Sequence, residues 1–146
     1  MDGDARYEVR HGAVPPELEA VEAALSRPGT RLLKESARVT VATITTSDGT
    51  FVLKRFRDDT VVRILEVLAL GSSARRVWRA AGLMRAGGFA VPEPVALLEK
   101  RRLGVAIRSC AVSRWVEGPA LDELWRARRG AARRSLTLGF ADYLGR

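Results

Sequence analysis

The spacing of apolar and β-branched residues predicts a block of strands in the first half of the chain. Residues 39–46 are rich in valine, threonine and isoleucine, which favour extended structure. Residues 50–57 form a second run of this kind, and the Asp48-Gly49 pair between the two supplies the positive φ angles of a tight hairpin turn. Together with the short apolar segment 31–34, these runs predict an antiparallel meander of three strands.

Apolar residues three and four positions apart predict helices on both sides of this meander. The first helix is expected at 17–26, where three apolar residues share one face after a Pro-Pro pair. A Pro-rich segment at 91–94 cannot be helical and separates later elements. In chain order, the other predicted elements are helices at 60–70 and 73–86, strands at 95–98 and 104–116, and helices at 120–129 and 131–145.

This order of elements predicts an α+β fold: a five-stranded antiparallel sheet with a helix inserted between the third and fourth strands. The 146 residues are 47% hydrophobic and 29% charged, which is typical of one globular domain. A single cysteine and a single histidine exclude an intramolecular disulfide and a structural zinc site. The N-terminus lacks a signal-peptide pattern and no apolar run is long enough for a bilayer, so we expect a cytoplasmic protein.

The net charge of +8 is carried almost entirely by arginine, which accounts for 22 of the 25 basic residues. Asparagine and glutamine do not occur. One explanation is a genome that favours arginine and alanine codons. The other is attraction to phosphate, on nucleotides, nucleic acid or anionic lipid, and charge alone does not choose among these.

Lys54 is the most informative single residue. On a strand it shares a face with the apolar residues Val52 and Phe56, so it must either reach out to water or point at an anion. A lysine is a compact point charge and suits a phosphate where a planar guanidinium does not fit. The structural alternative is a lysine on an edge strand that extends into solvent.

The motifs around Lys54 come in a particular order. The chain resembles the small N-terminal lobe of the protein-kinase-like fold, and more narrowly the lipopolysaccharide kinase family, which phosphorylates Kdo or heptose sugars of the lipopolysaccharide core. The likeness spans roughly residues 31–146. It rests on Phe51-Val52-Leu53-Lys54-Arg55-Phe56, Ala74-Arg75-Arg76-Val77-Trp78-Arg79, Gly88-Phe89-Ala90-Val91-Pro92-Glu93-Pro94 and Val112-Ser113-Arg114-Trp115-Val116-Glu117-Gly118.

The resemblance implies a nucleotide site. Lys54 would hold the α- and β-phosphates of ATP. The turn that contains Ser36 would cover the phosphates, Val39 and Val41 would cover the adenine with Val52 opposite, and Trp115, Val116 and Glu117 would form the hinge. It also implies three parts: an N-terminal helical extension at 1–30, a kinase-like lobe at 31–118, and the start of a second lobe at 119–146.

Three features depart from the family. The covering turn has Ser36, Ala37 and Arg38 where protein kinases place glycines, and Val77 stands where a glutamate should face Lys54. Glu66 is a possible substitute, although a glutamate at such a position is more often a solvated helix-face residue. The sequence has no catalytic aspartate motif and no magnesium ligands, so we assign no catalytic and no metal residues and expect a truncated product, a split gene's first half or a regulatory lobe.

The resulting interpretation is the ATP-binding N-terminal part of a lipopolysaccharide-core sugar kinase-like phosphotransferase, inactive alone. Its ligands would be ATP with magnesium and a glycolipid or core-sugar acceptor, and its partners a missing C-terminal lobe or a second copy. A basic run near the end either forms a solvated helix surface or contacts a phosphorylated glycolipid or the inner face of an anionic membrane: Arg126, Arg128, Arg129, Arg133 and Arg134. The alternative functions are a nucleic-acid-binding module, against which the 6% aromatic content argues, and a pseudokinase-like protein-binding module.

Overall fold

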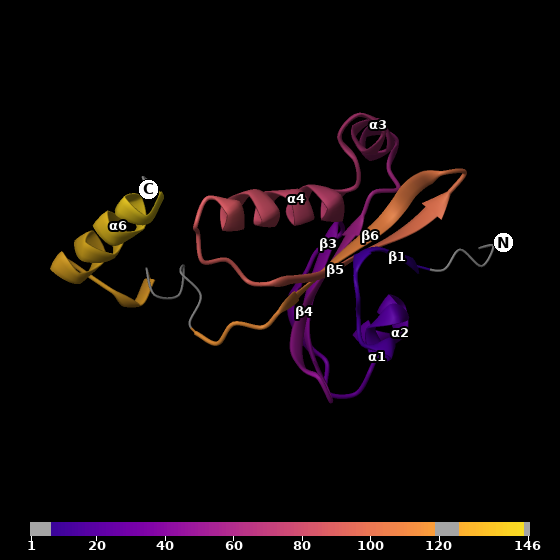
Figure 1. Cartoon of the computed structure of the whole chain (residues 1–146). Coiled ribbons are helices and arrows are strands. Elements are labelled where there is room, and N and C mark those ends of the chain that lie inside the picture. The colour runs from indigo at the N-terminus through magenta and orange to yellow at the C-terminus, as the bar shows by residue number, and fades with distance from the viewer. Residues whose placement is uncertain (1–6, 119–125, 145–146) are drawn as a thin grey trace. The chain divides into compact units, whose positions relative to one another are not determined.

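A computed structural model describes residues 7–118 and 126–144 of the chain. The chain forms two compact units, the first ending at Trp115 and the second beginning at Val116 (Figure 1). The first unit contains the sheet and all the predicted site residues up to Trp115. It also includes the segment 7–30, most of the N-terminal helical extension that the resemblance implied.

The first unit is built on one open antiparallel sheet, which confirms the α+β class. The described residues place six strands in it, in the order β1-β5-β6-β4-β3-β2 (Figure 1). The prediction of five strands is therefore wrong by one. The strands are β1 (Tyr7–Gly12), β2 (Arg31–Glu35), β3 (Val39–Thr46), β4 (Gly49–Arg57), β5 (Pro94–Arg102) and β6 (Val105–Arg114).

Strand β1 is the one that the sequence did not predict. It is short, its residues are exposed or half-buried, and it pairs with β5 at the edge of the sheet. At its end Gly12 has a φ of 73°, and a Cβ added there would lie 1.9 Å from the carbonyl oxygen of Val95. The backbone contact at this point therefore requires glycine.

One face of the sheet packs against two short helices, α1 (Pro16–Glu19) and α2 (Val21–Leu25). A single helix at 17–26 was predicted, but Ala20, with φ −88° and ψ 74°, interrupts it. Leu18, Val21 and Ala24 fill this core from the helical side, and Glu22 accepts a hydrogen bond of 3.1 Å from Arg108. The buried sheet residues of this core are Ile44, Phe51, Leu53, Ala96, Leu98, Cys110 and Val112.

The opposite face of the sheet packs against α4 (Ser73–Ala86). Here Ala74 of the helix packs with Phe56 and Leu97 of the sheet, and Val39, Trp78 and Ala111 lie partly buried around them. Ser72 caps the helix by accepting a hydrogen bond of 3.2 Å from the Arg75 backbone N–H. This second core is smaller than the first and leaves room for the pockets described below.

Helix α3 (Val61–Leu70) precedes α4 and has no buried residue. Its outward side chains are apolar: Val61, Val62, Leu65 and Leu68 are each more than 60% exposed. In the second unit the described residues include α6 (Ala131–Leu144), close to the helix predicted at 131–145. Most of the helix predicted at 120–129 lies outside the described residues. Among the described helices, none has the length and apolar character that crossing a membrane requires.

Candidate functional site

Lys54 lies on an interior strand of the sheet. Its strand, β4, is flanked by β3 and β6, and Lys54 stands directly opposite Val41 on one side and Ala111 on the other. These three residues therefore point to the same face, the one that α4 covers. Lys54 is half-buried there. The alternative of an edge-strand lysine extending into solvent is excluded by this position.

The Lys54 side chain lines an apolar pocket of about 310 Å³ between the sheet and the second half of α4. Most of the wall is aliphatic or aromatic, and Lys54 is the one charged side chain among the lining residues. Its Nζ lies 5.4 Å from the centre of the Phe56 ring, a cation–π contact. The other lining residues are Val52, Val77, Trp78, Ala80, Ala81, Met84, Val91, Pro92, Pro94, Ala111, Val112 and Ser113.

No carboxylate pairs with Lys54 among the described residues. Glu66, the substitute considered for the missing glutamate, instead pairs with Arg63 and with Arg76, whose Nη1 lies 3.7 Å away. Val77 lies in the wall of the same pocket as Lys54, where a carboxylate was expected from the resemblance. A half-buried ammonium without a counter-ion favours the approach of an anion.

The structure brings some of the predicted site residues together. Val52 lines the pocket with Lys54, and Val41 lies beside Lys54 on the neighbouring strand. Val39 lines a second pocket that adjoins the first at Val77. Ser36 lies in the turn before β3, is exposed, and its hydroxyl is bonded locally to the backbone of Val39.

The predicted hinge is divided between the two units. Trp115 ends the first unit, and its backbone N–H donates a hydrogen bond of 2.9 Å to the carbonyl oxygen of Thr50. That N–H is therefore occupied within the sheet. Val116 and Glu117 belong to the second unit and are exposed, so the structure does not place them beside Lys54.

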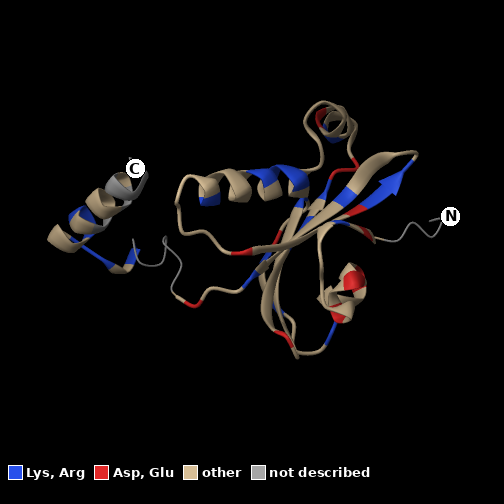
Figure 2. Cartoon of the chain, in the orientation of Figure 1, with Lys and Arg blue, Asp and Glu red and all other residues tan. Residues whose placement is uncertain are grey.

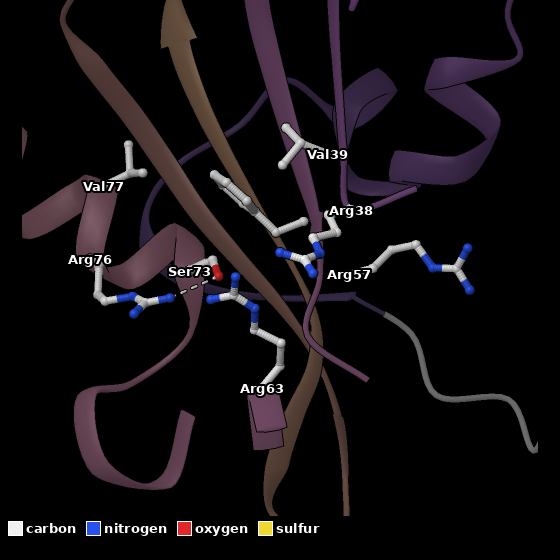
Figure 3. A pocket seen from close by; sticks show the side chains of 8 residues that line it. Arg38, Val39, Arg57, Arg63, Ser73, Arg76 and Val77 are labelled. Carbon is white, nitrogen blue, oxygen red and sulfur yellow. Dashed lines mark hydrogen bonds between the residues drawn. The ribbon is translucent and has the colours of Figure 1, made fainter. Parts of the chain in front are cut away.

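The second pocket has a volume of about 300 Å³ and was not predicted from the sequence (Figure 3). It lies between the turn before β3, the end of β4 and the first turns of α3 and α4. Four arginines line it, each from a different element: Arg38, Arg57, Arg63 and Arg76. The remaining lining residues are Val39, Phe56, Ser73 and Val77. These arginines are spread over 38 positions of the sequence, from Arg38 to Arg76. The sequence alone therefore does not show that they meet, whereas the fold does.

Two buried carboxylates near α4 hold the fold rather than a ligand. Asp58 accepts hydrogen bonds from the Ser73 hydroxyl at 2.5 Å, from the Ser73 backbone N–H at 3.3 Å and from the Ser109 hydroxyl at 2.7 Å. Glu99 accepts from Ser72 at 2.6 Å and from Arg101 at 2.6 and 2.9 Å. Burial alone would raise the pKa of Glu99, but the hydrogen bonds from Ser72 and Arg101 and the charges of Arg75 and Arg101 hold it below its ordinary value.

The other residues with reactive or ionisable side chains are buried or packed against neighbouring residues. Burial raises the pKa of the Cys110 thiol to about 12 and also raises the pKa of Tyr7. His11 stacks on Trp78 with ring centres 5.8 Å apart. Within residues 7–118 and 126–144, no group of three or more His, Cys, Asp or Glu side chains could hold a metal ion.

Basic side chains are distributed unevenly over the first unit. Figure 2 shows Lys and Arg along α4 and the β5–β6 hairpin, whereas acidic residues gather on α1 and α2. The two pockets on the α4 face thus combine an apolar wall, one lysine and four arginines. This combination suits a ligand with an apolar part and an anionic part. No family model, no curated protein and no solved structure matches the chain.

Proposed function

We propose that residues 31–118 contain a nucleotide-binding lobe of the protein-kinase-like type, and that the whole chain is the ATP-binding part of a lipopolysaccharide-core sugar kinase-like phosphotransferase. The observation that carries the proposal is the position of Lys54: half-buried, in an apolar pocket, on an interior strand and without a carboxylate partner among the described residues. An apolar pocket with one cation at its wall suits a heterocyclic base attached to phosphates.

The order of the strands supports the same proposal. Strands β2, β3 and β4 form a meander, α3 and α4 follow, and β5 and β6 return so that β6 lies next to β4. The N-terminal lobe of the protein-kinase-like fold, which the chain resembles, has this arrangement: three strands, a helix and two strands, with the lysine on the third strand. Strand β1 is an addition outside β5 and leaves the order of the other five unchanged.

In this proposal Lys54 neutralises the phosphates of ATP, while Val52, Ala111 and the aliphatic face of α4 bury the adenine. The magnesium ligands, the catalytic base and the binding of the acceptor sugar are assigned to residues outside this chain. The chain alone is therefore expected to bind nucleotide weakly and to transfer no phosphate. A glycolipid acceptor, contact with the inner face of an anionic membrane, and a C-terminal lobe or a second copy as partner remain expectations that follow from the resemblance.

Equilibrium binding of ATP and of adenosine to the full chain, measured by calorimetry, tests the proposal. Lys54→Met should weaken ATP binding about tenfold or more, because it removes a charge-assisted contact to phosphate, and should leave adenosine binding nearly unchanged. Lys34→Met is the matched control, since Lys34 is an exposed lysine on edge strand β2. Equal ATP affinity of the Lys54→Met variant and the wild type would refute the proposal.

A further inference from the structure

The pocket lined by four arginines is the strongest unassigned feature of the molecule. Arg38, Arg63 and Arg76 come from three different elements: the turn before β3, α3 and α4. Figure 3 shows these three side chains reaching into the same space beside Ser73, while Arg57 extends away from it. From this geometry we infer that the pocket binds a phosphate group through Arg38, Arg63 and Arg76.

The positive charge in the pocket is only partly balanced. Glu66 is shared between Arg63 and Arg76, and Arg57 has Asp59 at 3.5 Å. Arg38 has no carboxylate partner among the described residues. Three converging guanidinium groups therefore have one carboxylate in ion-pair contact, while the nearby Asp58 carboxylate is bonded to Ser73 and Ser109. The like charges of guanidinium groups that line one pocket repel one another, and an anion placed between them relieves that repulsion.

Arginine is a residue type well suited to binding phosphate. A guanidinium group offers a planar pair of N–H donors that can grip two phosphate oxygens at once, which an ammonium cannot do. Arg63 and Arg76 are each about one-third exposed, so their donors are accessible yet partly shielded from water. The apolar residues Val39, Phe56 and Val77 form the rest of the wall and strengthen charge–charge attraction by excluding water.

The first turn of α4 contributes to the pocket through its side chains. The backbone N–H groups of Ser73, Ala74 and Arg75 are already bonded, to Asp58, Ser109 and Ser72. A ligand would therefore bind the arginine side chains and not these backbone groups. The carboxylate of Asp58 already lies at the positive end of the helix dipole, so the arginine side chains carry the attraction for a further anion. Arg76 is fixed in place by donating a hydrogen bond of 3.2 Å to the Ser73 hydroxyl.

The phosphate group could come from two sources. It could belong to the nucleotide whose base lies in the Lys54 pocket, because the two pockets share Val77; this source rests on the proposed function. It could also belong to a phosphorylated sugar, independently of any nucleotide. The chemistry of recognition is the same in both cases.

Calorimetric binding of inorganic pyrophosphate to the full chain at near-physiological salt tests the inference. Arg38→Met and Arg76→Met should each weaken binding about tenfold or more. Arg79→Met is the matched control, because Arg79 lies on α4 but outside the lining of the pocket, and should bind as the wild type does. Glu66→Gln should tighten binding several-fold, since it removes the competing carboxylate; a merely structural role of these residues would not produce that gain.

Two further ligands distinguish the sources. Weaker ATP binding in both Lys54→Met and Arg76→Met indicates nucleotide phosphates, whereas glucose 6-phosphate binding that depends on Arg76 and not on Lys54 indicates a sugar phosphate. Either result supports the inference. It is overturned if pyrophosphate does not bind, or if Arg38→Met and Arg76→Met, folded as judged by circular dichroism, bind it as Arg79→Met does. A loss of ATP affinity in Lys54→Met, with no phosphate ligand whose binding depends on Arg38 or Arg76, would overturn the arginine pocket and leave the nucleotide proposal standing.

Discussion

Ser72 donates a hydrogen bond of 2.6 Å to Glu99 Oε1, and this contact joins the start of α4 to the middle of β5. Both residues are buried, with Glu99 only 1% exposed. Three arginines surround the second carboxylate oxygen: Arg101 at 2.6 Å, Arg75 at 3.5 Å and Arg10 at 3.8 Å. Because α4 forms one wall of both candidate pockets, this buried carboxylate positions the functional face of the sheet.

We expect Glu99→Gln to lower the free energy of unfolding by about 3 kcal/mol, since it leaves Arg10, Arg75 and Arg101, each about one-third exposed, without the buried carboxylate that they share. The matched control is Glu93→Gln: Glu93 pairs with Arg114 at 3.0 Å, but both side chains are more than half exposed. That variant should lose less than about 1 kcal/mol. Urea unfolding of the two variants beside the wild type measures the difference. Equal losses would contradict the buried role of Glu99.

The same carboxylate predicts a dependence of stability on pH. The pKa of Glu99 is lower in the folded chain than its ordinary value of 4.5, so the folded state holds its charge where the unfolded state begins to take up a proton. Its contribution is therefore complete above pH 4.5 and is lost as the pH falls through the folded-state value. The free energies of unfolding of wild type and Glu99→Gln should converge as the pH falls below 4.5; a constant difference would contradict this.

Much of the fold follows from the local sequence. The β-branched run at 39–46 and the Asp48-Gly49 turn specify their elements locally, and each is confirmed within a few residues. The edge strand β1 was missed although Tyr7-Glu8-Val9-Arg10 alternates between apolar and polar residues, because the run is short and its pairing with β5 is a tertiary contact. The break at Ala20 was missed because the helical spacing of Leu18 and Val21 continues across it.

The candidate site was only partly predictable, because some of its residues meet only through tertiary packing. Lys54 was identifiable because its neighbours on one strand face are apolar, which is a local pattern. The arginine pocket has no local pattern: Arg38, Arg63 and Arg76 are ordinary basic residues in the sequence, and the packing of α3 and α4 against the sheet brings them together. Whether Val116 and Glu117 act as a hinge stays a prediction.

Cys110 provides a probe of global opening. It is fully buried, and burial raises the pKa of its thiol to about 12, so it should react very slowly with a thiol reagent at pH 8 in the folded chain and rapidly in urea. Because it is the one cysteine in the sequence, the labelling is specific. Rapid labelling of the folded chain would contradict this burial.

The raised pKa of Cys110 also predicts a dependence of stability on pH. Its contribution to the free energy of unfolding is complete below pH 9 and falls as the pH rises towards 12, because the thiol of the unfolded chain ionises first.

Gly12→Ala tests the unpredicted strand. The new Cβ would meet the carbonyl oxygen of Val95 at 1.9 Å, and the φ of 73° is unfavourable for alanine, so the backbone of β1 must move away from β5. We expect a loss of about 2 kcal/mol in the free energy of unfolding, measured by urea denaturation. Gly82→Ala, in the interior of α4 with nothing within 4 Å, is the control and should be neutral or stabilising. An unaffected Gly12→Ala variant would show that β1 does not pair with β5 in this way.

Leu103 should be replaceable with a gain in stability. It occupies the two-residue turn between β5 and β6 with Gly104, has a φ of 51° and is 97% exposed. A left-handed conformation costs a branched side chain about 1 kcal/mol, whereas Asn followed by Gly is the preferred sequence of such turns. We therefore expect Leu103→Asn to raise the free energy of unfolding by about 0.5–1 kcal/mol in urea denaturation. Leu103→Val is the control and should destabilise, because a β-branched residue tolerates positive φ least; if Leu103→Asn lowers stability as well, the turn is held by contacts of the leucine side chain and not by its backbone conformation.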